Sequence, residues 1–286
     1  MALSACVFAE KKKVLYFTHE PGRWHKYAPQ KAIFTQLAEK AGWDLKVSTG
    51  DHDPQVLALR NPDLTKGYDA VVYNFCFAKS QDLEAAANVI AQTREKGTPA
   101  LLIHCSMHSF WSTFKSGKAG ALGTGYNGKA LADPALVAAW NKKNAGKPFP
   151  VWGDFTGVAS TKHGPKVPIT VTKCCDHDST KSLAAEGYKT VNAELYNNFY
   201  VTKDVKPILK GVQTFYSKKV QKKVASGKEL TAEEKKSAKK AEAIVMWEVP
   251  QGKSKVIGLT LGHGEGEWNQ SEFQKILIDA VNYLAK

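Results

Sequence analysis

Short, largely apolar runs alternate with segments of helical periodicity through the first 110 residues, and this alternation restricts the fold more than any other feature of the sequence. The runs read VLYFT, WDLKVST, YDAVVYNFCF and TPALLIHC, at residues 14–18, 43–49, 68–77 and 98–105. Apolar strands of this kind are buried on both faces, and helices between them require right-handed crossovers. The alternation predicts an α/β fold: a doubly wound, mostly parallel, flavodoxin-like sheet with helices on both faces.

The second half of the chain predicts a change of strand direction. The runs AIVMWEV (243–249) and VIGLTLG (256–262) flank the turn-forming PQGKSK, which is typical of a late antiparallel hairpin. Apolar residues at helical spacing from Phe273 to Leu284 predict a final helix. With 286 residues, 43% of them hydrophobic, the chain can bury a substantial core, and we expect residues 13–286 to form one domain.

A lysine-rich insertion stands out at about residues 218–240. It carries nine lysines and three glutamates, whereas the whole chain has a net charge of +13. Thr231 and Glu234 form a capping box, so the segment TAEEKKSAKKAEA (231–243) is predicted to be an exposed helix. The tract lacks the arginines and aromatic residues of nucleic-acid platforms, so we expect no nucleic-acid partner.

Residues 1–12 are predicted to lie outside the domain. Ala2 to Ala9 is apolar and precedes a run of charge, as in the tail of a signal peptide, and LSAC resembles a lipoprotein cleavage box at Cys6. A disordered start or an extension of the first strand are the alternatives. We expect a periplasmic or secreted protein, with the cytoplasm as the alternative, and no later run is long enough to span a bilayer.

The five cysteines predict neither a disulfide framework nor a zinc finger, because their number is odd and no two have CxxC spacing. Cys105 has a more specific reading. It follows the run at 98–105, while His263 and Glu265 follow the run at 256–262, and these are the parts of a Cys-His-Glu hydrolase. Free cysteine is also among the most buried residue types, so a structural Cys105 is the alternative.

Other polar residues also follow predicted strands. In open α/β sheets, ligands bind beyond the carboxyl ends of the strands. This rule places His19, Asn74 to Phe77 and the segment His104 to His108 along one edge. The segment THEPGRWHKY directly after the first strand carries an arginine, a tryptophan and two histidines, and we expect it to face a ligand.

The motifs LLIHCSMHSF, VPITVTKCCDHDSTKSL and AELYNNF, with the long segment from Met246 to Leu284, resemble the ThuA-like (trehalose utilisation) family. This family is a branch of the class I glutamine amidotransferase-like fold. The resemblance covers most of residues 14–286 outside the insertion. It implies that His104, Glu194 and His263 face one pocket, in a protein linked to sugar or oxidised-sugar metabolism. Amidotransferases flank their cysteine with glycines, but Ile103 and Met107 stand at those positions, which argues against amidotransferase chemistry.

These observations lead to three functional hypotheses. The first is a hydrolase or lyase acting on a small sugar or keto-sugar, with His104, Glu194 and His263 as general acid–base catalysts. Substrate would contact His19, His108, His177, Tyr196 and Trp268. A divalent metal such as zinc also suits two histidines and a carboxylate. The second is the Cys-His-Glu hydrolase, and the third is a non-catalytic sugar- or polyanion-binding protein. Under each of the three hypotheses the protein could be a homo-oligomer.

Overall fold

The computed structural model describes residues 10–110, 134–160, 162–198 and 200–286. A nine-stranded sheet with the order β2-β1-β3-β4-β11-β10-β9-β6-β7 runs through the molecule. Its strands are β1 (Lys13–Thr18), β2 (Asp44–Ser48), β3 (Ala70–Asn74), β4 (Ala100–Ile103), β6 (Val167–Lys173), β7 (Tyr188–Ala193), β9 (Lys206–Phe215), β10 (Lys239–Gln251) and β11 (Ser254–Leu259).

Strand direction divides the sheet into two parts. The five strands from β2 to β11 pair in parallel, whereas β10, β9, β6 and β7 each run antiparallel to the strand before them in the sheet. The predicted α/β class with its flavodoxin-like parallel part is confirmed. The predicted late hairpin is confirmed as the antiparallel pair β10 and β11.

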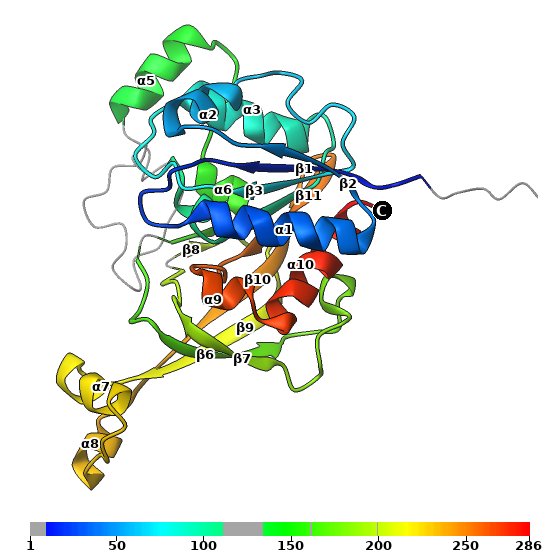
Figure 1. The fold of residues 1–286 in the computed structure, drawn as a ribbon. Helices are drawn as coiled ribbons and strands as arrows, with labels where there is room; N and C mark the ends of the chain where they lie inside the picture. The colour runs from blue at the N-terminus through cyan, green and yellow to red at the C-terminus, as the bar shows by residue number, and fades with distance from the viewer. Residues whose placement is uncertain (1–9, 111–133, 161, 199) are drawn as a thin grey trace, which may run out of the picture.

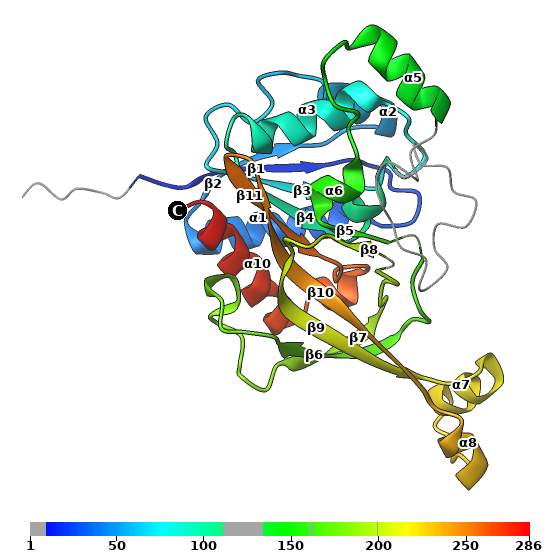
Figure 2. The ribbon, with the colours of Figure 1, turned by 180° about the vertical axis from the view of Figure 1, so that it is seen from behind.

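Helices cover both faces of the parallel part (Figures 1 and 2). One face packs against α1 (Tyr27–Ala41), α9 (Glu265–Trp268) and α10 (Ser271–Leu284), and the other against α2 (His52–Ala58), α3 (Leu83–Arg94) and α6 (Trp152–Thr156). Strand β1 shows why an unbroken apolar run is needed. Val14 and Tyr16 belong to the first core, whereas Leu15 and Phe17 belong to the second.

The remaining elements lie at the ends and edges of the sheet. They are the 3₁₀ turns η1 (His104–His108) and η3 (Asp178–Thr180), the helix α5 (Pro134–Lys143), and the strand pair β5 (Val158–Ala159) and β8 (Tyr200–Val201). No helix in the described part of the chain has the length and apolar character that crossing a bilayer requires. The apolar stretch from Ala2 to Ala9, with the LSAC motif that resembles a cleavage box at Cys6, lies outside the described residues.

The lysine-rich insertion forms the tip of the long β9–β10 hairpin, which projects from the body (Figures 1 and 2). We call this tip, residues 216–238, the basic arm. It contains α7 (Lys218–Ala225) and α8 (Ala232–Lys236), and the predicted capping box of Thr231 and Glu234 is confirmed. The predicted continuation of the helix to residue 243 is wrong, because residues 239–243 pair with β9 instead.

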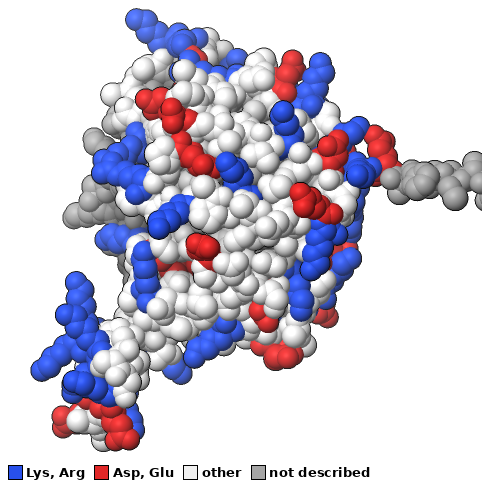
Figure 3. Space-filling view, in the orientation of Figure 1, with Lys and Arg blue, Asp and Glu red and all other residues white. Residues whose placement is uncertain are grey.

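Charge is unevenly spread over the arm. Lysine side chains gather over α7, and acidic side chains gather beside them at the end of the arm (Figure 3). Helix α7 buries Val220, while Lys223 is paired with Glu234 of α8. The arm is therefore a small internally bonded unit that presents most of its lysines to solvent.

Gly258 makes room for the largest side chain of the central strands. Trp247 of β10 stands directly across from Gly258 of β11, and its indole N–H donates to the carbonyl of Thr156 at 2.8 Å. A Cβ atom at Gly258 would collide with the Trp247 ring. Since Trp247 is fully buried, the ring has no free space to move into.

We expect Gly258→Ala to lower the free energy of unfolding by about 1–3 kcal/mol, the usual cost of overpacking a core. Gly50→Ala is the control, because a Cβ there meets only Gln55 at ordinary contact distances, and it should change stability by no more than about 0.5 kcal/mol. Urea unfolding followed by tryptophan fluorescence measures both. Equal effects of the two substitutions would contradict this account of the Trp247 pocket.

Candidate active site at the carboxyl edge of the sheet

Strand directions bring three distant segments to one edge of the sheet. His104 directly follows β4, His263 follows β11, and Glu194 directly follows β7. Strands β11 and β7 are separated by β10, β9 and β6, and every pairing along this path is antiparallel. An even number of reversals restores the original direction, so β7 ends at the same edge as β4 and β11. The three residues predicted to share a pocket are thereby brought together.

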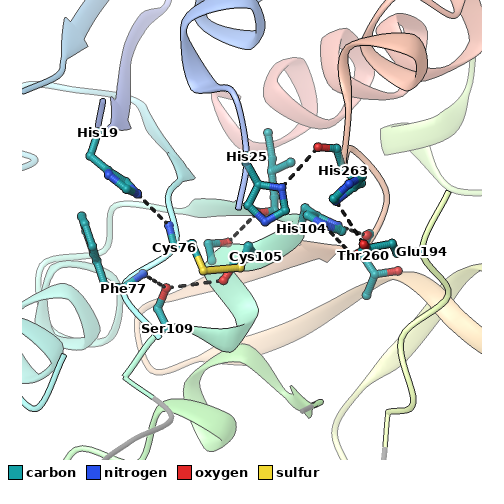
Figure 4. The surroundings of a disulfide bond; sticks show 12 residues. His19, His25, Cys76, Phe77, His104, Cys105, Ser109, Glu194, Thr260 and His263 are labelled. Atoms are coloured by element: carbon teal, nitrogen blue, oxygen red, sulfur yellow. Dashed lines mark hydrogen bonds and ion pairs between the residues drawn. A yellow bond between two sulfur atoms is a disulfide. The ribbon is translucent and has the colours of Figure 1, made fainter. Parts of the chain in front are cut away.

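A buried carboxylate occupies the centre of this cluster. Glu194 has a side chain only 6% exposed, and its Oε1 lies 3.3 Å from Nδ1 of His263, 3.4 Å from Nε2 of His163 and 3.1 Å from Nζ of Lys166. Its Oε2 lies 3.5 Å from Nε2 of His104. One carboxylate thus meets three imidazoles and an ammonium group (Figure 4 shows its contacts with His104 and His263).

His104 occupies a strained backbone position at the turn from β4 into η1. Its φ is +48°, in the left-handed region that residues with a side chain seldom adopt. The Nδ1–H donates to the carbonyl of Thr260 at 2.6 Å, which directs Nε2 toward Glu194. Backbone strain of this kind is concentrated at functional sites. The sharp strand-to-helix turn therefore presents a histidine, and the cysteine comes one residue later.

The hydrogen bond between Lys166 and the His263 ring fixes the tautomer of His263. Its Nε2 accepts from Nζ of Lys166 at 2.7 Å, so the ring proton resides on Nδ1 and faces Glu194. The loop itself is held by Glu267, whose carboxylate accepts from the backbone N–H groups of Gly262 at 3.0 Å and His263 at 2.8 Å. Glu267 is 1% exposed, and burial raises its pKa.

Burial and charge shift the ionisation of the cluster. Burial opposes the charged form of Glu194, but the contact with His104 and the charges of His263 and His163 outweigh it and lower the pKa of Glu194 below its usual range. Burial, together with the charges of His104 and Lys166, lowers the pKa of His263 to about 4, although Glu194 opposes this shift. At neutral pH an ionised carboxylate therefore faces a neutral imidazole on His263.

A cavity of about 350 Å³ opens beside this cluster. Its wall includes Trp24 and His25 from the segment between β1 and α1, which the sequence predicted to face a ligand. The ring of Tyr196 is stacked on His108 at a centroid distance of 4.2 Å. The residues that line the cavity are Trp24, His25, Cys76, Ala78, Lys79, Cys105, His108, His163, Lys166, Glu194, Tyr196 and His263.

Three of the residues predicted to touch substrate lie away from this cavity. His19 is 1% exposed and accepts a hydrogen bond from the backbone N–H of Cys76 at 3.3 Å, so it supports the wall from behind. Trp268 is fully buried and donates to the carbonyl of Gly262. His177 packs against Tyr283 of α10, at a centroid distance of 4.7 Å. Of the predicted contacts, His108 and Tyr196 line the cavity.

The predicted Cys-His-Glu triad is not assembled. Cys105 forms a disulfide with Cys76, a single bond that the number and spacing of the cysteines did not indicate (Figure 4). Glu265 is exposed in the first turn of α9, and the acid that holds the His263 loop is Glu267. The two cysteines pair because each follows one of two adjacent parallel strands, β3 and β4.

Sequence reasoning missed His163 and Lys166, which contact Glu194 from the segment before β6. Because β6 runs opposite to β7, it starts at the edge where β7 ends. The signal was the polar stretch KHGPK just before a predicted strand. This stretch can be assigned to the site only when the direction of the following strand is known.

A metal ion has a candidate ligand set in this cluster. Donor atoms of His25, His104 and His263 all lie within 4.8 Å of one another. Burial, with the charges of His104 and His263, lowers the pKa of His25 to about 3, so its ring is neutral at pH 7. Three imidazoles with an adjacent carboxylate fit a zinc site of the catalytic type.

The fold and the cluster define an α/β protein with its site at the carboxyl ends of parallel strands. The sequence model of the ThuA family, described as trehalose utilisation, matches residues 13–284, and the chain therefore belongs to the ThuA family. No curated protein matches the sequence.

Solved structures share this fold at low sequence identity. A ThuA-like protein from Bacteroides uniformis ATCC 8492 is 15% identical with a TM-score of 0.60, and the match covers 98% of this chain and 95% of that one. A ThuA-like protein from Parabacteroides merdae ATCC 43184 is 12% identical with a TM-score of 0.61, over 97% and 91%. A cytoplasmic protein from Salmonella typhimurium LT2 is 9% identical with a TM-score of 0.54, over 96% and 100%.

The neutral state of His25 predicts a loss of stability in acid. In the unfolded chain its imidazole takes up a proton near pH 6.5, whereas in the folded protein it stays neutral down to about pH 3. Protons thus favour the unfolded state as the pH falls from 6.5. Urea unfolding measures the free energy of unfolding at pH 6.5 and at pH 5.0. We expect this free energy to fall by about 1–2 kcal/mol less in His25→Asn than in the wild type over that interval.

His52→Asn is the matched control, since the His52 side chain is 42% exposed and lies outside the cavity. It should reduce the loss of stability in acid by less than His25→Asn does. An identical acid dependence for His25→Asn and the wild type would contradict the burial of a neutral His25.

Proposed function

We propose that the chain is an enzyme of carbohydrate metabolism, a hydrolase or lyase that acts on a small sugar or keto-sugar through His104, Glu194 and His263. The observation that carries the proposal is the ionised Glu194, buried against His263 on the wall of a cavity. A carboxylate that holds the Nδ1–H of a neutral histidine leaves the other ring nitrogen as a base. The pair also stabilises the imidazolium that forms once the base has taken a proton.

Elimination from a keto-sugar makes use of His263 and of the two groups beside it, Lys166 and His163. On binding, a substrate oxygen replaces Nε2 of His263 as the partner of Lys166, which frees Nε2 to remove the proton from the carbon beside the ketone. The C–H electron pair becomes an enolate, whose oxygen is stabilised by Lys166 and His163. The enolate then expels the glycosidic oxygen, which takes up the proton held by His263. Addition of water to the resulting double bond would complete a net hydrolysis.

The shape of the cavity supports a sugar as the ligand. A volume of about 350 Å³ is at the lower end of small-molecule sites, which suits a single sugar ring. Trp24 is 48% exposed and lines the cavity, and Tyr196 lines it as well. Aromatic faces pack well against the apolar faces of sugars. Of the two tryptophans, Trp24 is therefore the one that would stack on a sugar, because Trp268, which was predicted to contact substrate, is buried.

A divalent metal such as zinc would be held by His25, His104 and His263, whose donor atoms are already close together. When bound, the ion would polarise a sugar carbonyl as a Lewis acid. Glu194 would then be the outer partner of His263, because it faces Nδ1 of that ring, and the Thr260 carbonyl would be the outer partner of His104.

We expect His104→Asn, Glu194→Gln and His263→Asn each to lower kcat/KM by at least about 100-fold, since each removes a member of the acid–base set. The assay measures nitrophenol release from a nitrophenyl glycoside whose sugar carries a ketone. His177→Asn is the control, because His177 lies outside the cavity, and it should stay within about threefold of the wild type. Circular dichroism confirms folding. Full activity in all three site variants would exclude this assignment, as would a wild type without turnover of any keto-sugar glycoside.

A non-catalytic alternative places function on the basic arm. Its lysines project away from the body and would attract a sulfated or acidic polymer (Figure 3). Export to the periplasm or beyond, a cytoplasmic location and homo-oligomer formation remain predictions alongside either function.

For polyanion binding we compare two variants that remove the same charge. Lys218, Lys219, Lys222 and Lys223 of α7 are changed to Gln in one, and the exposed Lys40, Lys142, Lys147 and Lys275 of the body in the other. If the arm binds polyanions, only the first variant elutes from a heparin column at a clearly lower salt concentration. Equal shifts would show a response to net charge and would remove the alternative.

A further inference from the structure

The Cys76–Cys105 disulfide lies in the wall of the cavity, beside His25. The two Sγ atoms and a ring nitrogen of His25 lie within 4.8 Å of one another. Figure 4 shows the His25 ring between the His263 carbonyl and the disulfide. His25 therefore borders two potential ligand sets, one of nitrogen atoms and one with two sulfur atoms.

We propose that reduction of this disulfide creates a binding site for a thiophilic divalent metal such as zinc, with Cys76, Cys105 and His25 as ligands. A dithiol supplies two electrons and two protons, which convert the S–S bond into two thiols, and itself becomes a disulfide. A phosphine supplies two electrons and takes up the oxygen of a water molecule, whose two protons complete the two thiols. Metal binding then releases two protons as the thiols become thiolates. Two thiolates and one imidazole leave a fourth tetrahedral position open to the cavity.

The orientation of His25 supports this assignment. Its Nδ1 lies 3.3 Å from the His263 carbonyl, which can only accept, so the ring proton is on Nδ1 and the lone pair is on Nε2. A metal-binding histidine commonly donates its other N–H to a backbone carbonyl in this way. The low pKa of His25 keeps Nε2 unprotonated at neutral pH.

The surroundings of the two cysteines hold their backbones in place. Tyr27 and Ala78 pack with both cysteines in one buried apolar cluster. The N–H of Cys76 donates to His19, and Ser109 donates to the carbonyl of Cys105 at 3.5 Å. Both sulfurs thus stay close together after reduction, and the apolar shell limits the access of water.

Because His25 belongs to both ligand sets, the redox state decides which set is complete. In the oxidised protein, His25 is available to His104 and His263, whereas in the reduced protein it completes the sulfur site. This inference goes beyond the proposed sugar chemistry, and its test needs no substrate. A failure of one leaves the other standing.

The test uses Co²⁺ as a probe, since thiolate ligands give cobalt an intense near-ultraviolet charge-transfer band and imidazoles alone do not. Cys174 and Cys175 are exposed thiols, and Cys6 lies outside the described residues, so all three are changed to Ser in the parent protein. Alkylating the wild type before reduction is a second route to the same state. We expect the band after reduction by a phosphine, and no band in the oxidised protein.

Two further variants assign the ligands. Cys105→Ser in the same parent should abolish the band, and His25→Asn should weaken Co²⁺ binding at least tenfold. His104→Asn is the matched control, because Asn tolerates a positive φ and His104 belongs only to the nitrogen set, so the band should persist. A folded, reduced protein with two titratable thiols and no band would overturn the proposal. Loss of native circular dichroism on reduction, or a band that survives Cys105→Ser, would overturn it too.

Discussion

A buried carboxylate among imidazoles is the interaction on which the rest of the site depends. Removing the charge of Glu194 from water is costly unless hydrogen-bond donors and positive groups meet it. Here these come from the end of β4, the loop after β11 and the segment before β6. The cluster therefore joins the parallel and antiparallel parts of the sheet at one edge. It also presents a set of preorganised hydrogen-bonding groups to the cavity.

The fold could be predicted from the sequence because a strand buried on both faces needs an apolar side chain at every position. Val14, Leu15, Tyr16 and Phe17 are apolar in succession, since neighbours along β1 enter different cores. The hairpin of β10 and β11 and the apolar stripe of α10 were predictable for similar reasons, because local pattern and local structure coincide there. The place of His104 at this edge followed from the rule that sites lie beyond strand ends, whereas the meeting of His104, Glu194 and His263 was implied by the family resemblance.

Other parts of the site could not be predicted because they depend on the direction in which the chain turns. Glu265 and Glu267 both follow His263 closely, but only the short helix α9 decides that Glu267 points back to the loop and Glu265 to solvent. His177 follows a strand like the others, but β6 ends at the opposite edge of the sheet. The pairing of Cys76 with Cys105 likewise depends on the adjacency of β3 and β4, which cysteine spacing does not reveal.

The position of the basic arm concentrates positive charge at one end of the molecule. Strand β9 runs in the same direction as β11, so the arm leaves the sheet at the edge that carries the cavity. With nine lysines against three glutamates in residues 218–240, this end carries about half of the net charge of +13 in a small part of the mass. Near an acidic surface, the electric field of that surface exerts a torque on this uneven charge distribution. The torque turns the arm, and the cavity edge with it, toward the surface. Salt at physiological strength confines this alignment to roughly the last 8 Å of approach.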